Sequence, residues 1–263
     1  MIKMEHTEVS QMKAAFRGMR NPLDSWAQSD SKFALIPWEF AEEEAERFLQ
    51  EKQDELENMS EERRAKLEFY KDIDIPHEAI LRKDEEAIDA AFLGPKDLEL
   101  AKRLVKAGSD HGKFLRQIAV SVDITAPLFW WKEFDTYKVG TVANSCSTMH
   151  TLGKRILTLN DFSFEGVAPE SSDPADWPTD VITLIVACEQ TRQKFVETKD
   201  KAYWKRLIQM LPNAFNQKRT VTLNYQVLRN QYFSRGNHKL TEWHDYCAWI
   251  ESLPYAKELI LCQ

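Results

Sequence analysis

The spacing of apolar positions predicts a chain in which strands and helices alternate. Residues 118–124, IAVSVDI, place an apolar side chain at every second position, which is typical of a half-buried strand. The segment Thr125–Pro127 predicts a turn, and LFWWKEF after it resumes with helical spacing. A β-branched run at residues 219–222 indicates a further short strand. Strands mixed with helices at this spacing predict an α/β (α+β) domain.

Helical spacing predicts further helices at residues 96–107, 179–198, 201–210, 224–234 and 240–250. Gly108 is suited to the end of the first one, because glycine readily adopts the left-handed conformation that follows many helices. Leu211-Pro212 ends the third, since proline cannot continue a helix. Near the start of the chain, residues 1–36 predict a short strand or helix that ends at Asn21-Pro22.

Residues 37–94 are dense in charged side chains. The stretch AEEEAERFLQEKQDELENMSEERRAKLEFY contains too few apolar residues for a buried helix. We therefore expect exposed amphipathic helices here, forming a charged helical insertion at about 37–94 in a single domain of residues 1–263. A solvated insertion is the simplest interpretation. The alternative is a structural or regulatory protein that docks a partner through the helices at 41–69.

Composition and charge narrow the classes of function. The chain is 43% hydrophobic and 29% charged, which is ordinary for a globular protein and excludes general disorder. Its formal net charge of −7 argues against binding of duplex nucleic acid, which needs clustered Lys and Arg. One basic pocket for a nucleotide stays compatible with that charge, because net charge does not describe a cleft.

Cysteine spacing and hydropathy indicate a reduced, cytoplasmic setting. Cys146, Cys188, Cys247 and Cys262 include no C-x-x-C pair, so we expect no metal site and no redox pair. The N-terminal residues MIKMEHTEVS lack the apolar core of a secretory signal. The most apolar stretch, Ile118–Trp131, is too short and too polar to cross a bilayer, so we expect no membrane association.

Two segments carry candidate chemistry. The first is the loop KVGTVANSCS at residues 138–147, whose hydroxyls and backbone N–H groups would suit a phosphate, although such loops are more often simple turns. The second is residues 211–250, with Asn224, Asn230, Arg235 and His238. Asparagine amides suit a pyrimidine edge or a flavin amide, and arginine can bind a phosphate with two hydrogen bonds. The alternative for the second segment is a solvated surface helix.

The order of these residues resembles that of the flavin-dependent thymidylate synthase (ThyX) family. The resemblance covers roughly residues 95–160 and 200–250, with a weaker match at 14–29. Its elements, in chain order, are His111, Ala126-Pro127, Thr141, Asn144, Ser147, Leu211-Pro212, Thr222-Leu223-Asn224, Asn230, Arg235, His238 and Glu242. The block TAPLFWWKEFDTYKVGTVANS is also similar to phage-encoded proteins, which suggests a divergent phage-type member.

The resemblance implies a ThyX-like fold, with a mixed sheet flanked by helices, in a homotetramer located in the cytoplasm, or in the host cytoplasm if the protein is phage-encoded. It implies FAD as cofactor, with NADPH and methylenetetrahydrofolate used if the protein methylates a uracil nucleotide such as dUMP. Contacts to the flavin would come from His111, Asn224, Asn230 and His238. Binding of the nucleotide substrate would come from Lys138, Thr141, Asn144, Ser147 and Arg235. No catalytic residue is assigned, because such a protein mainly orients its cofactor and substrate.

The chain departs from the family pattern at its signature. Thr136-Tyr137-Lys138 stands where the family has Arg-His-Arg, and Lys132-Glu133 stands where it has Arg-Gln. Lysine keeps the charge of arginine but loses its planar pair of donors, so phosphate binding is weakened. Candidate replacements for the missing cations are Lys154, Arg155, Lys218 and Arg219. A non-catalytic descendant that binds a nucleotide or a protein is therefore the competing hypothesis.

Overall fold

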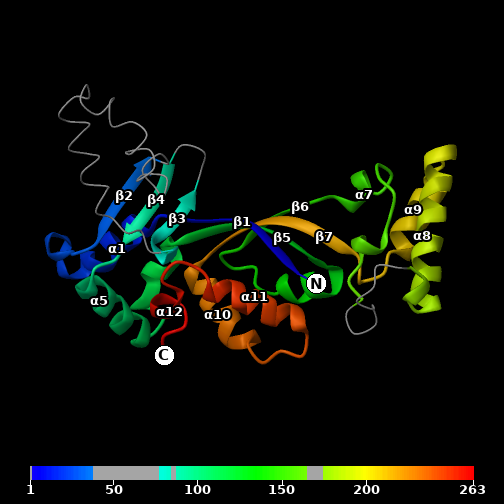
Figure 1. The fold of residues 1–263 in the computed structure, drawn as a ribbon. Helices are drawn as coiled ribbons and strands as arrows, with labels where there is room; N and C mark the ends of the chain where they lie inside the picture. Colours follow the sequence, from blue (N-terminus) through cyan, green and yellow to red (C-terminus); the bar gives the residue numbers. More distant parts are fainter. Residues whose placement is uncertain (1, 38–76, 84–86, 165–173) are drawn as a thin grey trace, which may run out of the picture. The chain divides into compact units, whose positions relative to one another are not determined.

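The described residues of the computed structural model are 2–37, 77–83, 87–164 and 174–263 (Figure 1). They form two compact units, each assembled from separate stretches of the chain. Unit 1 comprises Met1–His6, Val122–Val221 and Lys239–Tyr246. Unit 2 comprises Thr7–Ser121, Thr222–His238 and Cys247–Gln263. A single domain over the whole chain stays a prediction.

A four-stranded sheet has the order β1-β5-β7-β6. Its strands are β1 Lys3–Ser10, β5 Ala119–Pro127, β6 Val142–Ser145 and β7 Asn216–Asn224. Burial alternates along β5, so the predicted half-buried strand is confirmed. The predicted turn at Thr125–Pro127 is wrong, because β5 continues to Pro127. Proline is tolerated at a strand end, where its missing N–H leaves no gap in the ladder.

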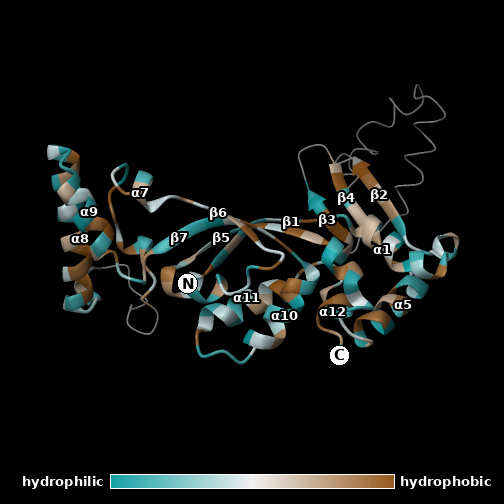
Figure 2. Cartoon of the chain, turned by 180° about the vertical axis from the view of Figure 1, so that it is seen from behind, coloured by the Kyte–Doolittle hydropathy of each residue, from teal (hydrophilic) through white to brown (hydrophobic). Residues whose placement is uncertain are grey.

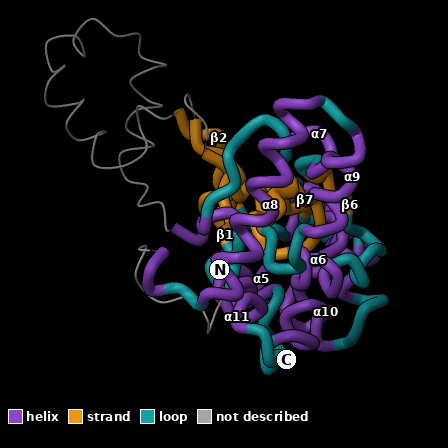
Figure 3. Tube along the Cα trace, turned by 90° about the vertical axis from the view of Figure 1, so that its right-hand side faces the viewer, coloured by secondary structure: helices purple, strands orange, loops and turns teal. Residues whose placement is uncertain are grey.

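Unit 1 carries helices with two apolar cores. Its elements are α6 Leu128–Phe134, α7 Thr148–Thr151, η6 Leu159–Asp161, η7 Pro174–Asp176, α8 Thr179–Thr198, α9 Lys201–Met210 and the first part of α11 Thr241–Glu251. One core is aromatic, with the ring of Trp130 stacked on Phe134 and also in contact with Trp243 and Tyr246. The other core contains Val181, Ile185, Cys188 and Leu207 on α8 and α9, which pack against each other (Figure 3).

Unit 2 combines helices with a small antiparallel sheet. Its helical elements are α1 Met12–Arg20, η1 Asn21–Leu23, η2 Trp26–Gln28, η4 His77–Ala79, α5 Pro95–Lys106, η5 Gly112–Gln117, α10 Tyr225–Arg235 and α12 Ala256–Leu259. The sheet has the order β2-β4-β3, with β2 Lys32–Pro37, β3 Ile80–Lys83 and β4 Ala87–Phe92. The segment η5 packs against both α1 and α10, and α12 packs against α5.

The predicted helical insertion at 37–94 is wrong for its last part. Residues 80–83 and 87–92 are strands, and residues 38–76, with the proposed docking helices, lie outside the described residues. The strands form because Ile88 and Ala90 repeat at period two and pack with Ile36 in an apolar cluster. Figure 2 shows the hydrophobic colour on β2 and β4, whereas the end of β3 is hydrophilic.

A buried carboxylate joins the start of α5 to the α1 region of unit 2. Asp97 is fully buried and accepts hydrogen bonds from Arg20 Nε, Ser29 Oγ and Ser31 Oγ, each at 2.5 Å. The neighbouring Asp30 accepts from the first backbone N–H groups of α5, which explains why the helix begins there. A buried carboxylate of this kind is stable only when its oxygens are paired.

Candidate functional site

The first group of predicted site residues lies on one segment of unit 1, residues 138–151. A turn brings Thr141 N within 3.4 Å of Lys138 O, with Gly140 in the left-handed region at φ 78°. The side chains of Lys138 and Asn144 are exposed, and those of Thr141 and Ser147 are half-buried. Ser147 directly precedes α7, and its carbonyl accepts a hydrogen bond from Thr151 Oγ1. All four nucleotide candidates of this segment lie within ten residues of one another along the chain, and their role stays a prediction.

Part of this segment is a strand, where the sequence predicts only a loop. Residues Val142–Ser145 form β6, next to β7 in the sheet, and just beyond it Cys146 N donates to Lys218 O at 2.8 Å. All four residues of β6 are exposed, so no alternation of burial marks it in the sequence. The strand exists because its backbone pairs with β7, which lies far away along the chain.

The hydroxyl of Thr141 is buried and has no hydrogen-bond partner among the described residues. Among the described residues, Thr141 Oγ1 is a buried oxygen with no hydrogen-bond partner, and Trp130 Nε1 in the aromatic core is a buried nitrogen with none. Most buried polar atoms in proteins are hydrogen-bonded, so an orphaned hydroxyl next to the predicted phosphate loop needs an explanation. A ligand that exchanges a hydrogen bond with Thr141 would supply one.

Three candidate cations are paired with carboxylates of the protein. Arg219 Nη1 forms a 2.7 Å ion pair with Asp135. Lys218 Nζ lies 2.8 Å from Asp123, and this hydrogen bond raises the pKa of Lys218 and lowers that of Asp123. The third candidate, Arg155, is paired with Asp161. Replacement of the missing Arg-His-Arg by these cations would therefore require existing ion pairs to break.

The residues that replace the Arg-Gln pair of the family also have partners within unit 1. Lys132 Nζ donates to Asn213 Oδ1 at 2.7 Å. Glu133 Oε2 accepts from Trp243 Nε1 at 3.3 Å, which ties α6 to the start of α11. These two side chains therefore hold unit 1 together.

The second group of predicted residues lies on α10 and just after it, in unit 2. Asn224 is the N-cap of α10, and its Oδ1 accepts from Val227 N at 3.1 Å. Asn230 is exposed, and its Oδ1 accepts from Gln226 Nε2 at 3.0 Å. Arg235 is half-buried in the last turn, and His238 N donates to its carbonyl at 2.9 Å.

His111 lies on a neighbouring segment of the same unit. Its side chain is exposed at the start of η5, which packs against α10. Tyr225 N donates to Ile118 O at 3.1 Å, so the first residue of α10 lies beside the end of η5. At a rise of 1.5 Å per residue, however, Asn224 and Arg235 at the two ends of α10 are about 16 Å apart. They cannot contact the same small ring, but a ligand as long as a dinucleotide could span them.

Two cavities lie outside the predicted residues. One of about 420 Å³ in unit 1 is mainly apolar and includes Trp177, Ile182 and Ile185. The other, of about 280 Å³ in unit 2, includes Asp89, whose pKa is raised by burial. The sequence contains a signal for the second cavity, because Asp89 interrupts the apolar strand AIDAAF. Within the described part of the chain, no group of three His, Cys, Asp or Glu side chains could hold a metal, and no helix is long and apolar enough to span a membrane.

Comparison with known proteins identifies the fold. The structure is similar to that of thymidylate synthase X (ThyX) from Helicobacter pylori with FAD and dUMP, with a TM-score of 0.58 and 13% sequence identity over 99% of this chain and 97% of that chain. The chain has a ThyX-like fold. A second structure, the flavin-dependent thymidylate synthase ThyX of Helicobacter pylori complexed with FAD and dUMP, gives a TM-score of 0.48 and 17% identity over 64% of this chain and 84% of that chain. No protein-family model and no curated protein matches the sequence.

The ThyX-like fold confirms the predicted fold class, a mixed α/β architecture with antiparallel sheets flanked by helices. At 13% identity the similarity concerns the fold and not the chemistry. The assignment of individual residues to flavin or nucleotide therefore stays a prediction.

Proposed function

We propose that this protein binds a uracil nucleotide together with a flavin, in the manner implied by its ThyX-like fold. The main observation behind the proposal is the Thr141 hydroxyl, which is buried and has no hydrogen-bond partner. It lies on the segment 138–151, where the resemblance implies that the nucleotide phosphate binds. The similarity of fold over 99% of the chain supports it, since the Helicobacter pylori protein was solved with FAD and dUMP. Lys138 on the same turn is exposed and supplies a positive charge.

We expect the predicted site residues to hold a flavin and a nucleotide as the resemblance implies. Around the flavin ring, the Nδ2 groups of Asn224 and Asn230 would donate hydrogen bonds, and His111 and His238 would contact the cofactor. Around the nucleotide, Lys138 and Arg235 would attract the phosphate, and the side chains of Thr141, Asn144 and Ser147 would supply hydrogen bonds. A bound reduced flavin supplies a hydride, and the family reaction also uses methylenetetrahydrofolate and NADPH to methylate dUMP.

A second candidate function is nucleotide binding without catalysis. The observation that favours it is the pairing of Arg219, Lys218 and Arg155 with carboxylates of the protein. Phosphate binding then rests mainly on Lys138, Arg235 and the remaining candidate, the exposed Lys154. A charge-assisted hydrogen bond contributes about 1.5–3 kcal/mol, so the loss of several weakens nucleotide affinity by orders of magnitude. Weak binding without turnover is the outcome expected of such a descendant.

The first experiment is to reconstitute the purified protein with FAD. We expect a visible flavin absorbance band that stays with the protein through gel filtration. Protein that takes up no FAD at high micromolar concentration would refute the flavin part of the proposal. Formation of dTMP from dUMP, methylenetetrahydrofolate and NADPH then separates an enzyme from a non-catalytic descendant.

The second experiment measures dUMP binding through thermal unfolding. Ligand at 100 times its dissociation constant stabilises a protein by about 2.7 kcal/mol. We expect dUMP to raise the unfolding temperature, and the variants Thr141→Val and Arg235→Ala to reduce the shift. Thr141→Val removes a hydroxyl that has no protein partner, so the variant should fold normally. Thr183→Val, on an exposed face of α8, is the matched control and should leave the shift unchanged.

We also propose an oligomeric state and a cellular location for the protein. The resemblance implies a cytoplasmic homotetramer, in an infected host if the protein is phage-encoded, with active sites that use residues from several subunits. Light scattering tests this directly: a tetramer is expected, and a monomer that still binds dUMP would refute a shared site.

A further inference from the structure

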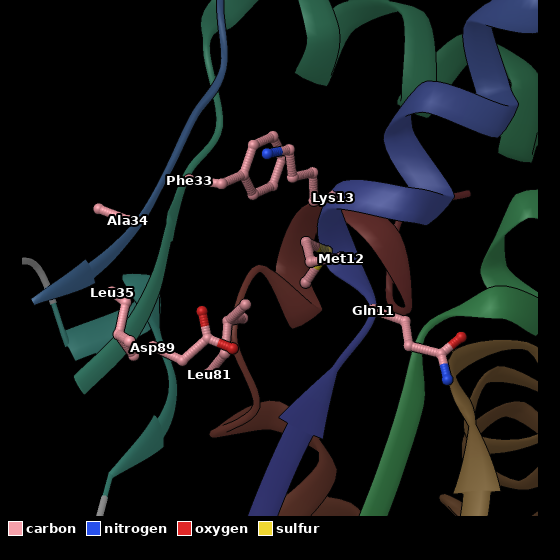
Figure 4. A pocket seen from close by; sticks show the side chains of 8 residues that line it. All are labelled: Gln11, Met12, Lys13, Phe33, Ala34, Leu35, Leu81 and Asp89. Atoms are coloured by element: carbon pink, nitrogen blue, oxygen red, sulfur yellow. The ribbon is translucent and has the colours of Figure 1, made fainter. Parts of the chain in front are cut away.

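A cavity of about 280 Å³ lies between the start of α1 and the small sheet of unit 2 (Figure 4). Met12 and Lys13 contribute from α1, and Phe33, Leu35, Leu81 and Asp89 contribute from the three strands. None of these residues belongs to the predicted flavin and nucleotide groups. The cavity is therefore independent of the proposed function.

Asp89 is the unexpected residue of this cavity. It lies on the central strand β4, opposite Leu35 of β2 and Arg82 of β3. Its neighbours Ile88 and Ala90 point to the other face and are fully buried in an apolar cluster. The cavity around Asp89 is lined mainly by the apolar side chains of Met12, Phe33, Leu35 and Leu81, with Gln11 and Lys13 as its other polar residues. An apolar side chain at position 89 would suit the packing better than a carboxylate.

The ionised carboxylate of Asp89 is disfavoured in the folded state relative to its neutral form. Burial raises the pKa of Asp89, and the attraction of Arg82 offsets this only in part. Figure 4 shows the Asp89 and Leu81 side chains reaching from the sheet toward Met12 at the start of α1. A carboxylate with a raised pKa that also lines a cavity is a candidate for ligand binding.

We propose that this cavity binds a small organic ammonium compound, with Asp89 as its counter-ion. The ammonium group pairs with the Asp89 carboxylate, and Phe33, Leu35 and Leu81 contact the apolar part of the ligand. The volume lies just below the usual range of ligand pockets, so a ligand of about ten non-hydrogen atoms fits. Lys13 at the α1 side places a second positive charge on the cavity wall and disfavours ligands with two ammonium groups.

Phenethylamine is a suitable probe, because it joins one ammonium group to one apolar ring. We expect saturable binding to the full chain in titration calorimetry, with a dissociation constant of about 1 mM or tighter. Its oppositely charged analogue, 3-phenylpropionate, should not bind. Asp89→Asn should weaken phenethylamine binding by at least about tenfold, since it keeps the shape and removes the charge. Asp24→Asn, an exposed carboxylate of the same unit, should leave the affinity unchanged.

A second pair of variants tests the apolar wall. Leu35 lines the cavity and Leu23 does not, although both are exposed, at 61% and 67%. Leu35→Ala should weaken phenethylamine binding, and Leu23→Ala should not. No saturable binding, or equal affinity in Asp89→Asn, would overturn the proposal.

Thermal unfolding without ligand completes the test. If Asp89 serves a ligand, Asp89→Asn should unfold at the same or a higher temperature than the unmodified protein, because the variant loses a charge that burial disfavours. A lower unfolding temperature would show that the carboxylate stabilises the fold. That result would also overturn the proposal.

Discussion

The guanidinium of Arg219 lies over the ring of Trp131, 4.1 Å from its centroid. The arginine is held there by the ion pair with Asp135 and by a 3.0 Å hydrogen bond from its Nε to Gln217 Oε1. Its side chain is only 13% exposed, whereas that of the neighbouring Lys218 is 45% exposed. Two adjacent cations on β7 therefore have different environments, and the first is built into the unit 1 core.

Arg219→Ala should destabilise the protein by about 1–2 kcal/mol, because a desolvated cation–π contact and its ion pair are lost together. Arg219→Lys should recover less than half of this, since an ammonium lacks the planar surface that stacks on an indole. Urea unfolding followed by fluorescence measures both. Lys218→Ala is the matched control and should change stability by less than about 0.5 kcal/mol. Equal effects of the two alanine variants would show that the stacking contributes nothing.

Asp97→Asn should lower the free energy of unfolding by about 3 kcal/mol, as expected when one partner of a buried ion pair is neutralised. The amide keeps only one acceptor oxygen, so it cannot accept all the hydrogen bonds that Arg20, Ser29 and Ser31 donate to the carboxylate, and the buried guanidinium loses its counter-charge. Chemical denaturation gives the value directly. Glu99→Gln, on an exposed face of the same helix, should stay within about 0.5 kcal/mol of the unmodified protein. A small effect of Asp97→Asn would mean that water replaces the lost contacts.

Cys146, Cys188 and Cys247 should differ in reactivity toward a thiol reagent at neutral pH. Cys146 is exposed next to β6, whereas Cys188 and Cys247 are buried. Burial raises the pKa of Cys188, and burial together with Glu251 raises that of Cys247 to about 11. Since the thiolate is the reactive form, Cys146 should react at least about tenfold faster than either. Mass spectrometry of partly labelled protein tests the order, and early labelling of Cys188 would contradict it.

Helices and central strands are the part of the fold that the sequence predicts well. The structure has α8 at Thr179–Thr198 and α9 at Lys201–Met210, which match the predicted bounds. The strand β5 and the helices α5, α10 and α11 are also found close to their predicted positions. In each of these elements the burial pattern or a clear end signal is visible locally. Local sequence is therefore enough to define them.

The strands β2, β3, β4 and β6 are not predicted from the sequence. The exposed strand β6 exists only because it pairs with β7, and β4 exists because it pairs with β2 from the other side of a long charged stretch. These two pairings join residues far apart in sequence. In β6 no local pattern marks the strand, whereas β4 has a short period-two apolar repeat within a charged region.

The candidate site was predicted in outline. The sequence has Lys138, Thr141, Asn144 and Ser147 on one segment, and their role as a nucleotide site stays a prediction. It could not show that Asn224 Oδ1 is occupied as a helix cap or that Arg219 is stacked on Trp131, because both facts depend on packing. The orphaned oxygen of Thr141 is likewise visible only in three dimensions.

The stability of unit 2 should depend on pH through Tyr232. Its hydroxyl donates to Glu251 Oε1 at 2.7 Å, and this hydrogen bond raises the pKa of Tyr232 from 10.0 to about 12. The folded state therefore favours the neutral phenol. The resulting stabilisation is complete below pH 10.0 and is lost as the pH rises through about 12. The stability difference between the unmodified protein and Tyr232→Phe should shrink over that range.

Absorbance titration provides an independent measurement of the same contact. Subtracting the tyrosinate signal of Tyr232→Phe isolates Tyr232, and Glu251→Gln should bring its pKa back toward 10.0. An unchanged titration in Glu251→Gln would show that the carboxylate does not hold the phenol.

Asn224 has two possible roles, and two substitutions separate them. As the N-cap of α10 it accepts from Val227 N through Oδ1, and Asn224→Ala should therefore cost about 1 kcal/mol of stability. Asn224→Asp keeps an acceptor at the cap and should preserve stability, since Asp and Asn are equally good N-cap residues. It removes the amide N–H groups, however, and so should weaken FAD binding if Asn224 donates to the flavin ring. Full FAD affinity in Asn224→Asp, measured by flavin fluorescence quenching, would limit Asn224 to capping the helix.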